Sequence, residues 1–118
     1  MKKLKRSECA ILPLVLKGKW YDMIKRGEKR EEYRDETSYW AVRLLKWGRA
    51  KGVHAVEFRR GYAKNAPRMA FAVHVFHFTS GKHFFYRQNF SDHPGWGEPS
   101  KPHFVIVLDD RVELEDEP

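Results

Sequence analysis

The chain has 118 residues, a length typical of one domain, and its 42% hydrophobic content excludes a disordered polymer. Lysine and arginine together (23) outnumber aspartate and glutamate (16), so the formal net charge is +7. Residues 109–118 hold six acidic residues and one basic residue, which leaves +12 on residues 1–108. A body this basic favours a polyanion such as nucleic acid, although a solvated lysine-rich surface would give the same composition.

A single cysteine, Cys9, excludes an internal disulfide and zinc motifs built from several cysteines. No apolar run approaches the ~20 residues that a membrane-spanning helix needs. We therefore expect a cytoplasmic protein that does not associate with membranes. Glycine-rich phosphate-binding motifs are absent, which predicts that the protein uses no nucleotide cofactor.

Charge and hydropathy divide the chain into three segments. Residues 1–10 form a basic N-terminal arm, residues 11–108 form the folded domain, and residues 109–118 form an acidic tail. We expect the final residues of the tail to be disordered and to repel or compete with RNA without stabilising the fold.

The first half of the domain alternates between strand and helix patterns. Residues 11–16 predict a short buried strand, and Pro13 assigns it to a sheet edge or bulge. From Lys17 the apolar residues recur at helical spacing, and Gly27 is expected to end this amphipathic helix in a left-handed conformation. Residues 29–34 are then predicted to be extended.

A second helix is predicted to begin after a cap at Thr37 or Ser38 and to end at Gly48. The rest is predicted to be β-structure, with strands at 53–60, 69–79, 83–87 and 103–108 and a hairpin turn at 80–82. Two helices followed by four or five mostly antiparallel strands predict an α+β domain with a small, partly open β-barrel.

Histidine spacing does not predict a metal site. His74 and His77 lie three residues apart on a predicted strand, so their side chains point to opposite faces and cannot share an ion. We expect no bound metal, and we expect these histidines to be packed or hydrogen-bonded.

The segment after Gly27 is crowded with charges of both signs. Along an extended strand Glu32 and Arg34 project from the same face, whereas Lys29 lies in the preceding turn and cannot be assigned to a face. Converging charged side chains could bind a polar ligand, or could activate water if Lys29 or Glu32 has a shifted pKa. Equally, these residues could form ion pairs on an exposed sheet edge.

The spacing Gly27-x-Lys29-x-x-Glu32-x-Arg34 resembles the GxKxxExR signature of ASCH domains, a branch of the PUA-like superfamily. The similarity extends over roughly residues 11–108 and includes segments around Arg43, around Tyr62 and around Trp96.

The resemblance implies a PUA-like β-barrel with helices packed against it and a cleft around the signature. Lys29 would be the cleft lysine, Glu32 the signature acid, and Arg34 the partner that holds a ligand or orients the acid. The family is linked to RNA binding, and some members are ribonucleases or hydrolyse the acetyl amide of acetylcytidine. Those amidohydrolases carry a threonine at the position of Glu32.

Basic and aromatic residues elsewhere are candidates for ligand contact. Arginine pairs with phosphate, and tyrosine or tryptophan stacks on unpaired bases, although these rings could equally pack on the barrel rim. The candidate RNA-binding residues outside the signature are Arg43, Arg59, Arg60, Tyr62, Arg68 and Trp96.

The leading hypothesis is an RNA-binding domain, or one that binds a nucleotide-like small molecule. One alternative is a small hydrolase of RNA or of a modified nucleoside that uses Lys29 and Glu32 as catalytic residues. Another is a regulatory module that binds a protein.

Overall fold

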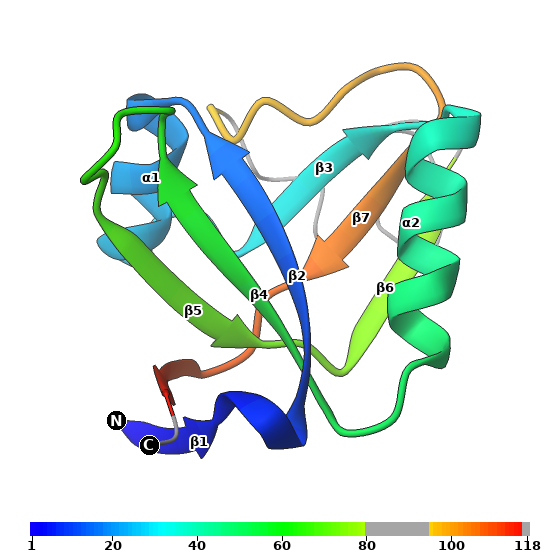
Figure 1. The fold of residues 1–118 in the computed structure, drawn as a ribbon. Helices are drawn as coiled ribbons and strands as arrows, with labels where there is room; N and C mark the ends of the chain where they lie inside the picture. The colour runs from blue at the N-terminus through cyan, green and yellow to red at the C-terminus, as the bar shows by residue number, and fades with distance from the viewer. Residues whose placement is uncertain (80–94, 117–118) are drawn as a thin grey trace.

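The computed structural model describes residues 1–79 and 95–116, and Figure 1 shows their arrangement. The elements in chain order are β1 (Lys2–Lys5), the 3₁₀ turn η1 (Arg6–Glu8), β2 (Cys9–Leu16), α1 (Gly18–Lys25), β3 (Glu31–Asp35), α2 (Ser38–Arg49), β4 (Val53–Arg60), β5 (Arg68–Ala72), β6 (Val75–Thr79), β7 (His103–Val107) and β8 (Arg111–Glu115). The predicted turn at 80–82 and strand at 83–87 lie outside the described residues.

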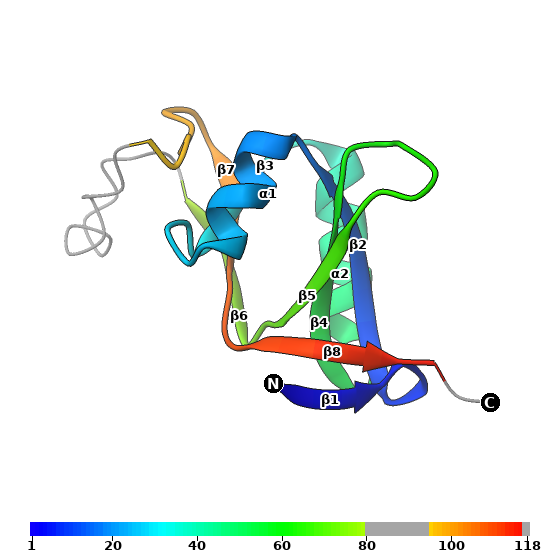
Figure 2. The same ribbon diagram turned by 90° about the vertical axis from the view of Figure 1, so that its left-hand side faces the viewer.

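The strands form two sheets, one with the order β1-β8-β5-β4-β2 and one with the order β3-β7-β6. Helices α1 and α2 lie on opposite sides of this pair of sheets (Figures 1 and 2). The fold is therefore α+β with mostly antiparallel strand pairs, as predicted, but the described strands do not close into a barrel. Neither helix combines the length and apolar character that crossing a membrane requires.

Local sequence signals account for both helices. Gly27 has φ +79°, the left-handed conformation expected just after α1. The Thr37 side chain accepts a hydrogen bond from the Trp40 N–H and caps α2, again as predicted. The prediction that Gly48 ends the second helix is wrong, since α2 continues through Arg49.

β2 occupies an edge of the larger sheet, as Pro13 predicts, and pairs in parallel with β4. A proline is tolerated there because an edge strand leaves one row of backbone groups unpaired with another strand. The end of β2 leads directly into α1, so residues 15–20 lie where the strand and the helix meet.

The predicted strand at 69–79 is wrong as a single element. It breaks at residues 73–74 into β5 and β6, which belong to different sheets. The chain also changes sheets from β7 to β8, and this crossing lies beside the one between β5 and β6: the Ala72 N–H donates to the Asp110 carbonyl, and the Asp109 N–H donates to the Ala72 carbonyl. His74 lies in the break, and its Nδ1 is hydrogen-bonded to the Asp109 carboxylate.

The hydrophobic core lies between the sheets and both helices. Phe58 from β4, Leu44 from α2 and Ile106 from β7 are each fully buried in one continuous cluster. Burying apolar side chains of this size contributes ~1.5–3 kcal/mol each. The core therefore holds β3 and α1 in fixed relation to the larger sheet.

Strands β1 and β8, near the two ends of the chain, lie side by side (Figure 2). β8 pairs with β5 and also with β1, and Val112 is buried. The expectation of a disordered acidic tail is wrong for Arg111–Glu115, because alternate residues of this segment face a second small core. The basic arm likewise contributes β1 and the start of β2.

Candidate functional site

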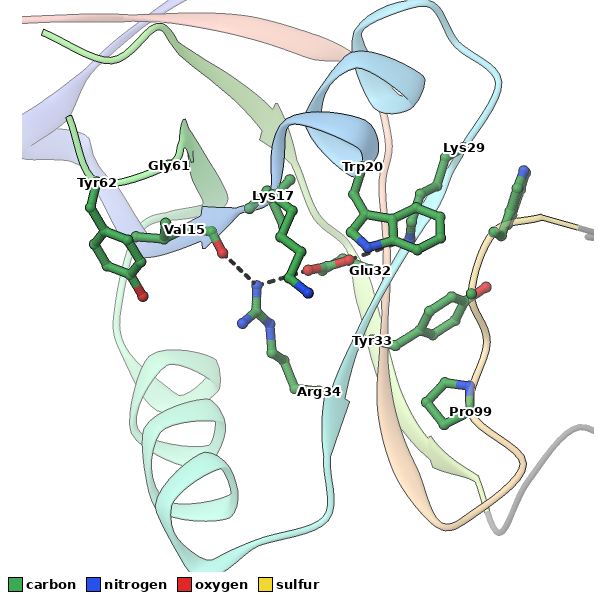
Figure 3. Close-up of a pocket in the computed structure, with 13 residues that line it drawn as sticks. Val15, Lys17, Trp20, Lys29, Glu32, Tyr33, Arg34, Gly61, Tyr62 and Pro99 are labelled. Carbon is green, nitrogen blue, oxygen red and sulfur yellow. Dashed lines mark hydrogen bonds and ion pairs between the residues drawn. The ribbon is translucent and has the colours of Figure 1, made fainter.

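A pocket of about 450 Å³ opens between α1, the end of β2, β3 and the loop that contains Trp96 (Figure 3). Its charged lining residues are Lys17, Lys29, Glu32 and Arg34. Three of these four belong to the signature segment that the sequence singles out. The three signature residues Lys29, Glu32 and Arg34 therefore line one pocket.

Glu32 binds both signature cations. Its Oε2 lies 2.7 Å from Arg34 Nη2, and its Oε1 lies 3.3 Å from Lys29 Nζ. Alternation along β3 places Glu32 and Arg34 on one face, as predicted. Lys29, whose face the sequence leaves open, turns toward the same carboxylate.

Burial separates this cluster from a surface ion pair. Lys29 is 2% exposed and Glu32 is 6% exposed. Exposed pairs contribute only ~0–1 kcal/mol, whereas breaking a buried pair leaves a charge without compensation. The alternative of ion pairs on an exposed sheet edge is therefore wrong for these residues.

The surroundings of Lys29 are closely fitted to its amine. Nζ donates to the Glu31 carbonyl and to Glu32, and it lies 4.4 Å from the centre of the Tyr33 ring. Burial lowers the pKa of Lys29 below its ordinary value of 10.5, and the Glu32 carboxylate opposes this shift. Desolvation has the larger effect, so this amine gives up its proton more readily than a surface lysine does.

Arg34 links the pocket to both neighbouring elements. Its Nη2 also donates to the Val15 carbonyl of β2, and its guanidinium stacks 4.9 Å from the ring centre of Trp40 in α2. Among the described residues, its Nε has no hydrogen-bond partner although it is buried. At least one N–H group of this guanidinium is therefore not used by the described residues.

Aromatic rings form much of the remaining wall, and they are Trp20, Tyr33, Tyr62 and Trp96. Tyr62 is 86% exposed at the rim, so its ring is available to a ligand without disturbing the core. The loop that contains Trp96 packs closely on Trp20, because a Cβ on Gly97 would lie 2.7 Å from that indole. The predicted candidates Tyr62 and Trp96 therefore line the pocket.

Four predicted basic residues do not line the pocket. Arg43 lies over the rings of Tyr39 and Trp40 on α2. Arg60 forms a bidentate ion pair with Asp22, with both N···O distances 3.0 Å. The other two are Arg59, which donates to backbone carbonyls of the following loop, and Arg68, which is exposed at the start of β5.

Lys17, Trp20 and Tyr33 line the pocket but are not sequence-predicted site residues. Lys17 and Trp20 fit the amphipathic pattern of α1, so the sequence gives no sign that they also line a pocket. Tyr33 alternates with the signature residues along β3 and is expected on the other face. The structure brings these three residues into the wall of one pocket.

The site combines one carboxylate, three cations and several rings, and it suits a planar ligand with an anionic group. Within residues 1–79 and 95–116, no three histidine, cysteine, aspartate or glutamate side chains lie close enough together to hold a metal ion. No protein-family model matches the chain, and neither does any curated protein or solved structure.

Proposed function

We propose that the protein is an ASCH-like domain of the PUA-like superfamily, with a partly open barrel, that binds single-stranded RNA or a nucleotide-like ligand in the cytoplasm. One observation carries the proposal: Lys29, Glu32 and Arg34 of the signature meet in the wall of a single pocket. Lys29 and Glu32 are buried where they line this pocket, and buried charged groups gathered in a cleft are characteristic of functional sites.

The chemistry of the wall supports a nucleotide in particular. Lys17, Lys29 and Arg34 exceed Glu32 by two positive charges, which favours an anionic group such as phosphate. Tyr62 and Trp96 offer ring faces on which an unpaired base can stack, an interaction that contributes ~1–3 kcal/mol per base. The net charge of +12 on residues 1–108 adds a longer-range attraction for RNA.

We expect Tyr62→Ala to weaken binding of single-stranded RNA about tenfold without changing the melting temperature, because its ring is exposed and stacks only on the ligand. Affinity of the parent should fall steeply with salt, since phosphate contacts release counterions. Fluorescence anisotropy with a labelled oligonucleotide measures both effects.

The matched control is Tyr39→Ala. Tyr39 is 61% exposed on α2, away from the pocket, so RNA affinity should be unchanged. Absence of RNA binding at low salt, or equal losses for the two tyrosine variants, would contradict the proposal.

Gly97→Ala tests whether the Trp96 loop belongs to the site. The added Cβ would meet Trp20, and φ +76° is strained for alanine by ~1–2 kcal/mol. Gly95→Ala is the control, because its φ of +88° carries the same strain but its Cβ meets no atom within 4 Å. We expect both variants to lose stability and only Gly97→Ala to lose about tenfold in RNA affinity. Equal RNA affinities for the two variants would mean that the Trp96 loop is not part of the binding site.

A hydrolase of RNA or of a modified nucleoside is the second candidate. The observation that favours it is the buried Lys29 amine, whose lowered pKa and contact with Glu32 suit proton transfer. The same protein incubated with RNA and acetylated nucleosides tests this function. Turnover that is abolished by Glu32→Gln would favour the enzyme. If the protein showed no RNA binding and no turnover, this result would favour a protein-binding module.

A further inference from the structure

The pocket contains one hydrogen-bond acceptor group whose capacity is only partly used. Each oxygen of the Glu32 carboxylate accepts from one cation: Oε1 from Lys29 and Oε2 from Arg34. A carboxylate oxygen can accept two hydrogen bonds, so one position remains on each oxygen. Glu32 lines the pocket, so a ligand bound there can reach this carboxylate.

Lys29 does not offer a matching donor. Its amine has at most three protons, and it already donates to the Glu31 carbonyl and to Glu32 and lies over the Tyr33 ring. Lys29 therefore acts on a ligand indirectly, because its hydrogen bond orients Glu32. The other cations that line the pocket are Arg34, which contacts Glu32 directly, and Lys17, which is exposed.

The pocket wall thus places one hydrogen-bond acceptor, Glu32, beside cations. Figure 3 shows the Glu32 carboxylate between the Arg34 guanidinium and the Trp20 indole, and all three residues line the same pocket. A base that presents its edge to Glu32 in this pocket meets a hydrogen-bond acceptor, while Arg34 and Lys17 are the cations available to its phosphate. Because Glu32 accepts hydrogen bonds, a base whose edge faces it must supply a hydrogen-bond donor.

We propose, on the basis of the proposed function, that Glu32 makes this pocket select nucleotides whose base has an exocyclic amino group, and that it discriminates against uracil. Cytosine and adenine present an amino donor, and a glutamate carboxylate accepts from such a group. Uracil has a carbonyl oxygen where cytosine has its amino group, so at that position its lone pairs oppose the carboxylate, and only its N3–H remains as a donor on that edge. Placing a carbonyl oxygen against a buried carboxylate in this way discriminates between the two bases.

The experiment compares oligonucleotides that differ only in the amino group, with anisotropy as the readout. Oligo(C) is compared with oligo(U) of equal length, and oligo(A) with an oligomer of purine riboside, which lacks only the exocyclic amine. We expect the amino-bearing member of each pair to bind at least ~tenfold more tightly, the lower end of the discrimination from one good base contact.

Two variants identify the residue responsible. Glu32→Gln should narrow the ratio of the oligo(C) and oligo(U) affinities, because glutamine can donate to a uracil carbonyl. Lys17→Ala should weaken both oligomers by the same factor and leave the ratio unchanged, since it removes only charge near the phosphate. If Glu32→Gln does not fold, two measurements still test the proposal. They are the affinities of the parent protein within each oligomer pair and the ratio of the oligo(C) and oligo(U) affinities of Lys17→Ala.

The outcomes separate this inference from the proposed function. Equal affinities within both pairs would overturn selection by Glu32 while RNA binding stands. An oligo(C) to oligo(U) ratio that survives in folded Glu32→Gln would also overturn it. Failure of every oligomer to bind would overturn the proposed function itself.

Discussion

Deletion of residues 111–118 is expected to lower the free energy of unfolding by at least ~3 kcal/mol. β8 lies between β1 and β5, so its removal leaves both strands without their shared partner. Val112 is buried, and Leu114 packs with Leu4 against the small core beside it. Each apolar side chain contributes ~1.5–3 kcal/mol when fully buried, before the lost strand pairing is counted.

Urea unfolding followed by circular dichroism measures this loss. Deletion of residues 116–118 alone is the control, because it keeps every residue of β8 and, of the described ion pairs, removes the exposed one between Arg6 and Asp116. Coincident unfolding curves for the two deletions would mean that β8 does not stabilise the fold.

Glu32→Ala is expected to cost ~3–5 kcal/mol of stability, the range measured when one partner of a buried ion pair is removed. Lys29 would then remain 2% exposed with no carboxylate partner. Replacing both partners, as in Lys29→Met with Glu32→Leu, should recover most of the loss, since apolar side chains of similar volume fill the site. A Glu32→Ala cost below ~1 kcal/mol would mean that the pair behaves as a surface pair.

The pH dependence of stability offers a second measurement on Lys29. Because its pKa is lower in the folded protein than the ordinary 10.5, unfolding takes up a proton between the two values. The free energy of unfolding contributed by this residue therefore rises as the pH increases through that window. The stability difference between the parent and Lys29→Met should shift in favour of the parent as the pH approaches 10.5, and a constant difference would contradict the shift.

Short-range patterns predict the parts of the site that depend on one element alone. Glu32 and Arg34 share a face because strand alternation requires it, and Gly27 ends α1 because only glycine adopts that backbone conformation cheaply. Lys29 lies in a turn, where no period applies. Its burial depends on how the turn packs against Tyr33 and Glu31, and the sequence holds no local record of that packing.

Other errors arise where tertiary structure overrides propensity or charge. Residues 69–79 have strong β-propensity throughout, yet propensity does not show that the chain changes sheets at residues 73–74. In the tail, the acidic residues conceal an alternating strand pattern whose apolar members are Val112 and Leu114. Arg59 and Arg60 directly precede residues 61–62, which line the pocket. Arg59, however, donates to a backbone carbonyl of its own loop, and Arg60 is paired with Asp22.

The pairing of β1 with β8 also governs when the larger sheet can be completed. It joins Lys2 to Val112, and among the described strands β1 pairs with β8 alone. A contact between segments so distant in sequence carries a large loop-closure entropy and slows folding. During synthesis the basic first strand stays unpaired until residues 111–115 leave the ribosome, so a nascent chain presents positive charge and an open β5 edge until its last strand arrives.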